Sequence, residues 1–201
     1  MKRRDFLISS SIGAVATLAA GSAMAQTPMQ TPWDWTAENG LTRFLKVDTN
    51  PLENEFEKYP RCPYCGMVRQ AFSFSRHLIV YSDDTVDGTC SIHCAAISLA
   101  LNLDRGPKAI YAGDAGDAAE VKPLIDVDTA YYVIDPHKMG TMTAVSKFAY
   151  SDKAKAEAAA AGPDASLTDF NGALTLAYAD MARDTITIRA RRAEKRAMPK
   201  M

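Results

Sequence analysis

Four cysteines, arranged in two pairs, are the residues in this chain best suited to chemistry. Cys62 and Cys65 are separated by two residues, and Cys90 and Cys94 by three. A Cys-x2-Cys turn places two sulfur atoms on one side of a tight loop, and Gly66, directly after it, permits the necessary backbone bend. This spacing predicts a metal site with tetrahedral sulfur coordination.

The elements expected around the cysteines would bring the two pairs together. Residues 76–81 and 85–89 are rich in β-branched and aromatic residues and predict two strands, joined as a hairpin by the polar turn at 82–84. The residues after Cys90 recur at helical spacing, so Cys90 precedes a helix and Cys94 lies in its first turn. Amide groups at a helix N-terminus favour the thiolate that metals require. Knuckle, hairpin and helix start are the layout of a treble-clef-type metal site.

Further donor side chains lie near these cysteines in the sequence or in one polar loop. Met67 follows the first pair directly, and Met139 and Met142 stand in a Pro/Gly loop where a role as core filler is hard to assign. His93 lies between Cys90 and Cys94, and His137 precedes Met139. Thioether and thiolate donors together favour Cu(I) over hard ions, and imidazole is compatible with them.

Three interpretations of the cysteines remain open from the residues alone. Soft-metal handling, with Cu(I) as the preferred ion, is favoured by the additional methionines. A structural Zn(II) closed by four thiolates is the first alternative. Two disulfides are the second, because cysteines of exported proteins are commonly oxidised. A thioredoxin-like redox role is disfavoured, since no βαβ pattern surrounds Cys62.

A second group of elements repeats the first further along the chain. Residues 131–134 predict a strand, a polar loop follows at 135–142, residues 144–150 predict another strand, and 153–161 form an alanine-rich helical pattern. The order strand, loop, strand, helix therefore occurs twice.

Other segments complete the expected architecture. Residues 108–112 predict a strand, residues 168–183 an amphipathic helix, and the alternation of Trp33 and Trp35 an extended segment. The fold class is α+β, with two small strand–strand–helix (ββα-type) units, a treble-clef-like cysteine knuckle and a C-terminal helix. We expect five segments: a signal peptide at 1–25, an N-terminal extension at 26–58, a cysteine-rich metal-binding ββα unit at 59–106, a second ββα-type unit with the methionine loop at 107–162, and a C-terminal helix and basic tail at 163–201.

The N-terminus predicts export. Lys2, Arg3 and Arg4 precede a weakly apolar stretch and a small-residue cleavage site ending at Ala25, the pattern of a secretory signal. The paired arginines followed by Asp5 and Phe6-Leu7 are typical of the twin-arginine translocase, which carries folded cargo. We therefore expect a periplasmic protein that starts near Gln26, with no stable membrane anchor.

Charge and motifs exclude several functions. Without residues 1–25 the chain carries 20 Lys and Arg against 23 Asp and Glu, which argues against nucleic acid as a partner. The basic cluster at 189–196 is interpreted as a solvated helix end. No nucleophile elbow, phosphate loop or H-E-x-x-H motif is present, so nothing in the sequence predicts an enzyme.

At the residues Cys62-Pro63-Tyr64-Cys65-Gly66-Met67, the hairpin after them and the methionine loop, the sequence resembles the NosL family, accessory proteins of nitrous oxide reductase. The resemblance covers roughly residues 55–185. It implies a periplasmic Cu(I) chaperone with two related ββα-type units. It also implies copper ligands among Cys62 or Cys65, Met67, and Met139 or Met142.

The resemblance further implies an apo-metalloprotein recipient, such as a nitrous oxide reductase-like enzyme. The sequence departs from the family pattern in lacking a lipid-attachment cysteine and a Met-x-His sequence, and in adding Cys90 and Cys94. The alternative function is an interaction module that zinc or disulfides merely stabilise.

Overall fold

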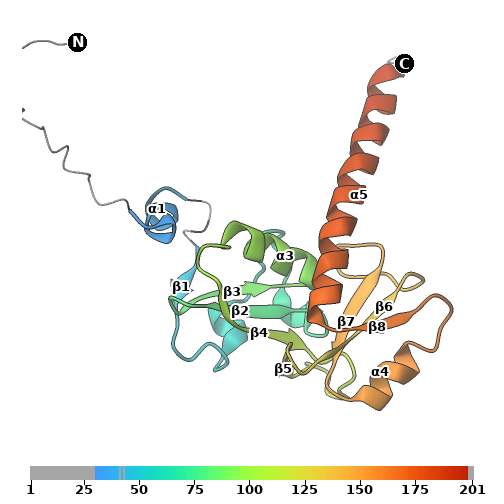
Figure 1. Ribbon diagram of the computed structural model, residues 1–201, viewed down its shortest axis with the longest axis horizontal. Coiled ribbons are helices and arrows are strands. Elements are labelled where there is room, and N and C mark those ends of the chain that lie inside the picture. The colour runs from blue at the N-terminus through green and yellow to red at the C-terminus, as the bar shows by residue number, and fades with distance from the viewer. Residues whose placement is uncertain (1–29, 41, 43, 199–201) are drawn as a thin grey trace, which may run out of the picture. The chain divides into compact units, whose positions relative to one another are not determined.

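Two antiparallel sheets form the framework of the protein in this computed structural model, which describes residues 30–40, 42 and 44–198 (Figure 1). Residues from Thr31 onward group together as one compact unit. The first sheet has the strand order β1-β3-β2-β4-β5, and its strands are β1 Lys46–Val47, β2 His77–Tyr81, β3 Thr85–Thr89, β4 Pro107–Gly113 and β5 Leu124–Asp126. The second has the order β7-β6-β8, and its strands are β6 Tyr131–Asp135, β7 Ser146–Tyr150 and β8 Ser166–Thr168.

The helices of the described residues lie before, between and after these strands. They are α1 Pro32–Asn39, α2 Glu55–Lys58, the 3-10 helix η1 Arg69–Phe72, α3 Ile92–Leu101, α4 Lys153–Ala159 and α5 Phe170–Ala197. Among them, none has the length and apolar content that crossing a membrane requires. The expected signal peptide lies outside the described residues.

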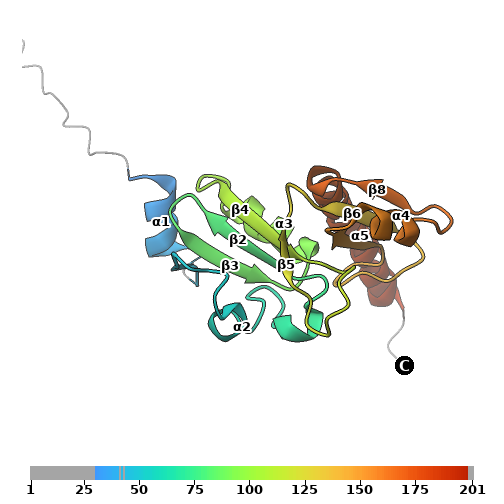
Figure 2. The same ribbon diagram turned by 90° about the horizontal axis from the view of Figure 1, so that it is seen from below.

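The same ββαβ arrangement occurs twice. In the N-terminal ββαβ unit, β2 and β3 form a hairpin, α3 follows, and β4 pairs with the free edge of β2. In the C-terminal ββαβ unit, β6 and β7 form the hairpin, α4 follows, and β8 pairs with β6. The two expected ββα units and the α+β class are thus confirmed, and each unit gains a third strand after its helix (Figure 2).

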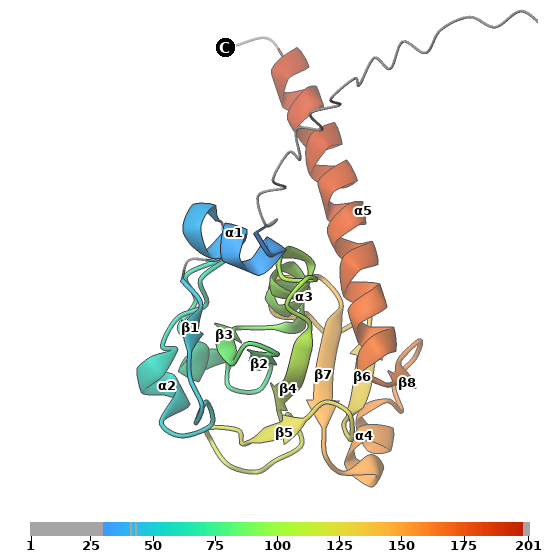
Figure 3. The same ribbon diagram turned by 60° about the vertical axis from the view of Figure 1, so that its left-hand side comes forward.

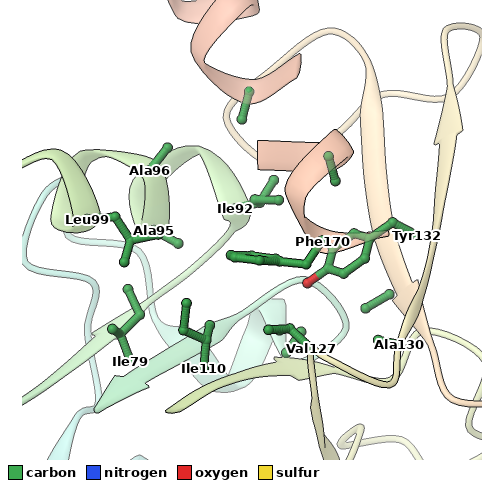
Figure 4. Close-up of a cluster of buried hydrophobic side chains, with 14 of the residues drawn as sticks. Ile79, Ile92, Ala95, Ala96, Leu99, Ile110, Val127, Ala130, Tyr132 and Phe170 are labelled. Carbon is green, nitrogen blue, oxygen red and sulfur yellow. The ribbon is translucent and has the colours of Figure 1, made fainter. Parts of the chain in front are cut away.

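One apolar cluster joins the two units. Because strand side chains alternate between faces, Ile79 and Tyr81 of β2 point to the same side, where α3 covers them. Tyr132 of β6 and Phe170 at the start of α5 belong to the same cluster, with their ring centroids 5.9 Å apart. Figure 4 shows side chains from both sheets, α3 and α5 meeting there. Burial of this shared surface stabilises the packing of the two units against each other, since each buried aliphatic side chain contributes roughly 1.5–3 kcal/mol.

The structure corrects the expectations at three places. Residues around Trp35 form α1 rather than an extended segment, because Thr31 caps the helix and Pro32 suits its first position. β5 and β8, three residues each, were not expected, since such short strands leave little alternation to detect. α5 ends at Ala197 instead of near residue 183.

Candidate metal centre

The loop from Cys62 to Met67 forms a tight knuckle. The Gly66 amide donates to the Cys62 carbonyl at 2.8 Å, and the Cys62 amide donates to the Met67 carbonyl at 2.9 Å. Gly66 has a φ of 77°, a left-handed conformation that glycine adopts without steric cost. The turn chemistry predicted from the sequence is therefore confirmed.

The second cysteine pair is delivered by the hairpin and the helix that follows it. Cys90 comes directly after β3, and Cys94 lies in the first turn of α3. Ser91 occupies the N-cap position without a capping bond from its side chain. The start of α3 thereby presents two sulfur atoms toward the knuckle.

The four sulfur atoms converge on one point. The Sγ of Cys65 lies 3.4 Å from that of Cys90 and 3.9 Å from that of Cys94, and the Sγ atoms of Cys90 and Cys94 are 3.7 Å apart. With Cys62, all four lie within 4.8 Å of one another, and all are free cysteines. A tetrahedral centre with metal–sulfur bonds of about 2.3 Å has sulfur–sulfur edges of about 3.8 Å. The spacing therefore fits one tetrahedrally coordinated ion.

Hydrogen bonding sets the charge of this cluster. Hydrogen bonds from Cys90 and then Cys94 lower the pKa of the Cys62 thiol well below its ordinary value. The pKa values of Cys90 and Cys94 are raised, in each case chiefly by the hydrogen bond to Cys62. One thiolate thus accepts from protonated neighbours, so binding an ion through all the sulfurs releases protons.

A buried polar network ties the knuckle to α3. The hydroxyl of Tyr64, which lies between Cys62 and Cys65, donates to Asp87 Oδ2 at 2.6 Å. The hydroxyl of Ser98 in α3 donates to the same oxygen, also at 2.6 Å. Burial raises the pKa of Asp87 to about 6. Because one carboxylate in β3 joins both cysteine-bearing segments, it fixes their separation.

A buried guanidinium also supports this region. Arg69 has no exposed surface and donates to the carbonyls of Tyr59, His77 and Thr89, while its charge pairs with Glu55 at 2.7 Å. Gly88 allows this approach, because a Cβ there would lie 2.8 Å from the Arg69 guanidinium carbon. The carbonyl of Thr89, directly before Cys90, is thereby held in place.

Ser75 links the methionine loop to the backbone of Cys90. Ser75 Oγ donates to the carbonyl of Cys90 at 2.9 Å and hydrogen-bonds Thr141 Oγ1 at 2.8 Å. Met142, next to Thr141, has a φ of 65°, a conformation that costs a long side chain energy. Met142 is 39% exposed and Met139 82% exposed.

The other expected ligands are placed as follows. Met67 packs against the cysteine cluster. His93 is half-buried, and its Nδ1 has no hydrogen-bond partner in the part of the chain that the structure describes. His137 lies in an exposed loop, 3.3 Å from Asp164. Among the described residues, the one group of three or more His, Cys, Asp and Glu side chains close enough to share an ion consists of the four cysteines, without His93 or His137.

Sequence reasoning missed the supporting residues. Asp87 offered a signal, since a carboxylate between Val86 and Gly88 in a predicted strand is unusual unless it has partners. Arg69 and Glu55 offered none, because their contacts join segments that are distant along the chain.

The fold and the site define an α+β protein with a four-cysteine centre at the junction of a knuckle and a helix. The sequence model of the NosL family matches residues 53–174, which is more than half of the chain. The chain belongs to the NosL family.

The chain is similar to a solved structure, the crystal structure of the copper chaperone NosL from Shewanella denitrificans. The two share 24% sequence identity with a TM-score of 0.45, over 55% of this chain and 87% of that chain. A search of curated proteins finds no match.

Proposed function

We propose that this protein binds Cu(I) through its cysteine centre outside the cytoplasm and delivers the ion to an apo-metalloprotein, without catalysing a reaction. The observation that carries the proposal is the convergence of four free sulfur atoms at distances suited to one soft ion. Thiolates select Cu(I) and Zn(II) among the common ions. Membership of the NosL family favours copper, and the paired arginines at the N-terminus favour export as folded cargo.

Methionine distinguishes copper handling from a closed zinc site. Cu(I) accepts thioether ligands, whereas structural zinc sites are closed by four thiolate or imidazole donors. Met142 is strained and follows Thr141, which the Ser75 bridge connects to Cys90. We assign Met142 as the thioether donor that joins the thiolates during uptake or release, and Met139, on the exposed side of the loop, as a residue without that role.

A transferable ion requires a donor set that can be exchanged one ligand at a time. Cys65 is the most exposed of the four cysteines, while Cys62, Cys90 and Cys94 are buried. Cys65 is therefore the ligand that a thiol or thioether of a recipient reaches first. A nitrous oxide reductase-like enzyme is the recipient that the family suggests.

The test is an anaerobic titration of the protein with Cu(I) and with Zn(II), each against a competing chelator. We expect Cu(I) to bind much more tightly than Zn(II) and to be removed by an apo-recipient. Met142→Leu should weaken Cu(I) binding by about tenfold, or about 1.4 kcal/mol, and the matched Met139→Leu should leave it unchanged.

A structural zinc centre is the second candidate, because three of the four cysteines are buried and the sulfur spacing is tetrahedral. Zinc that resists chelators, whose removal unfolds the protein, would establish that function and refute copper delivery. Equal Cu(I) affinities in the two methionine variants would show that Met142 is not a copper ligand.

A further inference from the structure

The C-terminal half of α5 forms the longest run of exposed residues in the part of the chain that the structure describes. From Ala182 to Met198 each residue is exposed. In Figures 1 and 3 this part of the helix, coloured red, runs clear of both sheets. The hydroxyls of Thr185 and Thr187 donate to carbonyls one turn back in the same helix. We call residues 183–198 the arm.

The composition of the arm is poor for a helix that stands in water. Residues 185–188 read Thr-Ile-Thr-Ile, and β-branched side chains lose χ1 freedom in a helix. Ile186 and Ile188 are 66% and 45% exposed. Helices without tertiary packing are marginal in water, so a helical arm with exposed isoleucines has the properties of a surface that another molecule covers.

The charge of the arm is opposite to that of the rest of the protein. The arm holds six Lys and Arg against two Asp and Glu, a net charge of +4. Residues 30–182 hold 13 Lys and Arg against 21 Asp and Glu, a net charge of −8. Opposite charges segregated in this way attract one copy of the chain to another, most strongly at low ionic strength.

Three of the exposed carboxylates lie near the start of α5, and we call them the acidic surface. Asp126 and Asp128 are exposed in the turn after β5, and Asp169 is exposed as the N-cap of α5. Asp128 and Asn171 line one cavity of about 180 Å³, so this turn and the helix start are neighbours. The arm lies at the opposite end of the same helix. An arm therefore reaches the acidic surface of a different molecule more readily than its own.

We propose that the arm is a self-association surface, and that in a pair of copies each arm lies on the acidic surface of the other. This arrangement is symmetric, since the same two patches meet twice. Because Ile186 and Ile188 stand two positions apart on the helix, each arm turns one of its two isoleucines toward the partner. The pairing does not depend on metal, so it stands or falls independently of the proposed copper delivery.

Sedimentation of the purified protein at about 50 mM and about 500 mM NaCl tests this pairing, because the higher salt shortens the range of charge attraction. We expect twice the chain mass at low salt and the single-chain mass at high salt. The variant R189E/R192E/R196E, which inverts one face of the arm, should weaken pairing at least about tenfold. A chain ending at Ala182 should remain single.

The matched control places the same charge change on the body. K46E/K138E/K153E alters three exposed lysines outside the arm and should pair as tightly as the unaltered protein or more so. Circular dichroism of each variant verifies that it is folded. The proposal is overturned by a single-chain mass at low salt, by pairing of the chain that ends at Ala182, or by loss of pairing in the body variant. An arm-dependent attachment of the single chain to phosphatidylglycerol vesicles would also overturn it, and would assign the arm to a membrane surface.

Discussion

The two ββαβ units have the same strand order and the same helix position, yet they use the junction between second strand and helix differently. In the N-terminal unit this junction is Cys90-Ser91, between β3 and α3. In the C-terminal unit it is Ser151-Asp152, between β7 and α4. Cys90 joins the sulfur cluster, whereas the Ser151 hydroxyl donates to Asp114 and Asp152 accepts from the amide of Lys155.

This difference shows that topology provides a position and the residues provide the chemistry. A helix start directly after a strand offers free amide groups in both units. In the C-terminal unit the Asp152 carboxylate accepts from one of those groups, the Lys155 amide, as is usual at a helix N-cap. In the N-terminal unit the same position carries the thiol of Cys90, which lies 3.4 Å from the knuckle residue Cys65.

Replacement of the junction cysteine should produce the largest effect. Cys90→Ser removes a sulfur that lies within 3.7 Å of both Cys65 and Cys94. We expect Cu(I) affinity to fall by at least about a thousandfold, or about 4 kcal/mol. Ser151→Ala, at the equivalent place in the C-terminal unit, should leave the affinity unchanged. Competition titration measures both affinities. An unaltered affinity in Cys90→Ser would show that the junction of the N-terminal unit does not supply a metal ligand.

A core substitution in the C-terminal unit tests whether the units depend on each other. Phe148 is buried with Val133 and Ala156 and contacts Phe74 edge-on at 5.3 Å. Phe148→Ala should lower the free energy of unfolding by about 3–4 kcal/mol, because the cavity adds to the lost burial.

Since Tyr132 and Phe170 connect the units through the shared cluster, unfolding should remain a single transition. Urea unfolding followed both by tyrosine fluorescence and by cysteine accessibility checks this point. Cysteines that stay protected after the fluorescence change would mean that the units unfold separately. The Cu(I) affinity of the folded variant should be unaltered.

The buried carboxylate of Asp87 in the N-terminal unit makes the stability of the protein depend on pH. Because burial raises the pKa of Asp87 to about 6, the folded state binds a proton more tightly than the unfolded state, where the pKa is about 3.9. Stability from this group is therefore greatest at low pH and is lost as pH rises through 6. Between pH 5 and 7.5 the loss should be about 1–1.5 kcal/mol.

Asp87→Asn removes this dependence while keeping an oxygen that accepts from Tyr64 and Ser98. His77 has its pKa lowered to about 4, mainly by burial, and it changes stability in the opposite sense over the same range. Because His77 is present both in the unaltered protein and in Asp87→Asn, its contribution cancels when their pH dependences of stability are subtracted. Urea unfolding of the metal-free, reduced proteins at the two pH values measures the effect. Equal pH slopes would show that Asp87 is not the group responsible.

The sequence was informative where local pattern decides structure. β-branched and aromatic runs located β2, β6 and β7, and helical spacing located α3 beside the cysteines. The knuckle could be predicted because Cys-x2-Cys-Gly restricts the chain within a few residues. This local rule places Cys62 and Cys65, and the predicted hairpin and helix start bring Cys90 and Cys94 to the same point.

Elements whose stability comes from distant partners could not be predicted in this way. β8 exists because β6 offers an edge, and a three-residue strand carries no pattern of its own. The arm of α5 contradicts its local propensity at residues 185–188. The Tyr64–Asp87 hydrogen bond joins residues 23 positions apart, and the Arg69–Thr89 hydrogen bond residues 20 positions apart, so no short-range spacing rule predicts them.

Helix capping gives the smallest difference between the units. Asp152 accepts a hydrogen bond from the Lys155 amide at 2.9 Å, whereas Ser91 makes no capping bond with its side chain. Asp152→Ala should therefore cost about 1 kcal/mol of unfolding free energy, and Ser91→Ala less than about 0.5 kcal/mol. Thermal unfolding of the two metal-free variants measures the difference. A larger loss for Ser91→Ala would mean that its hydroxyl, which lies 3.8 Å from Cys90 Sγ, stabilises the thiol cluster rather than the helix.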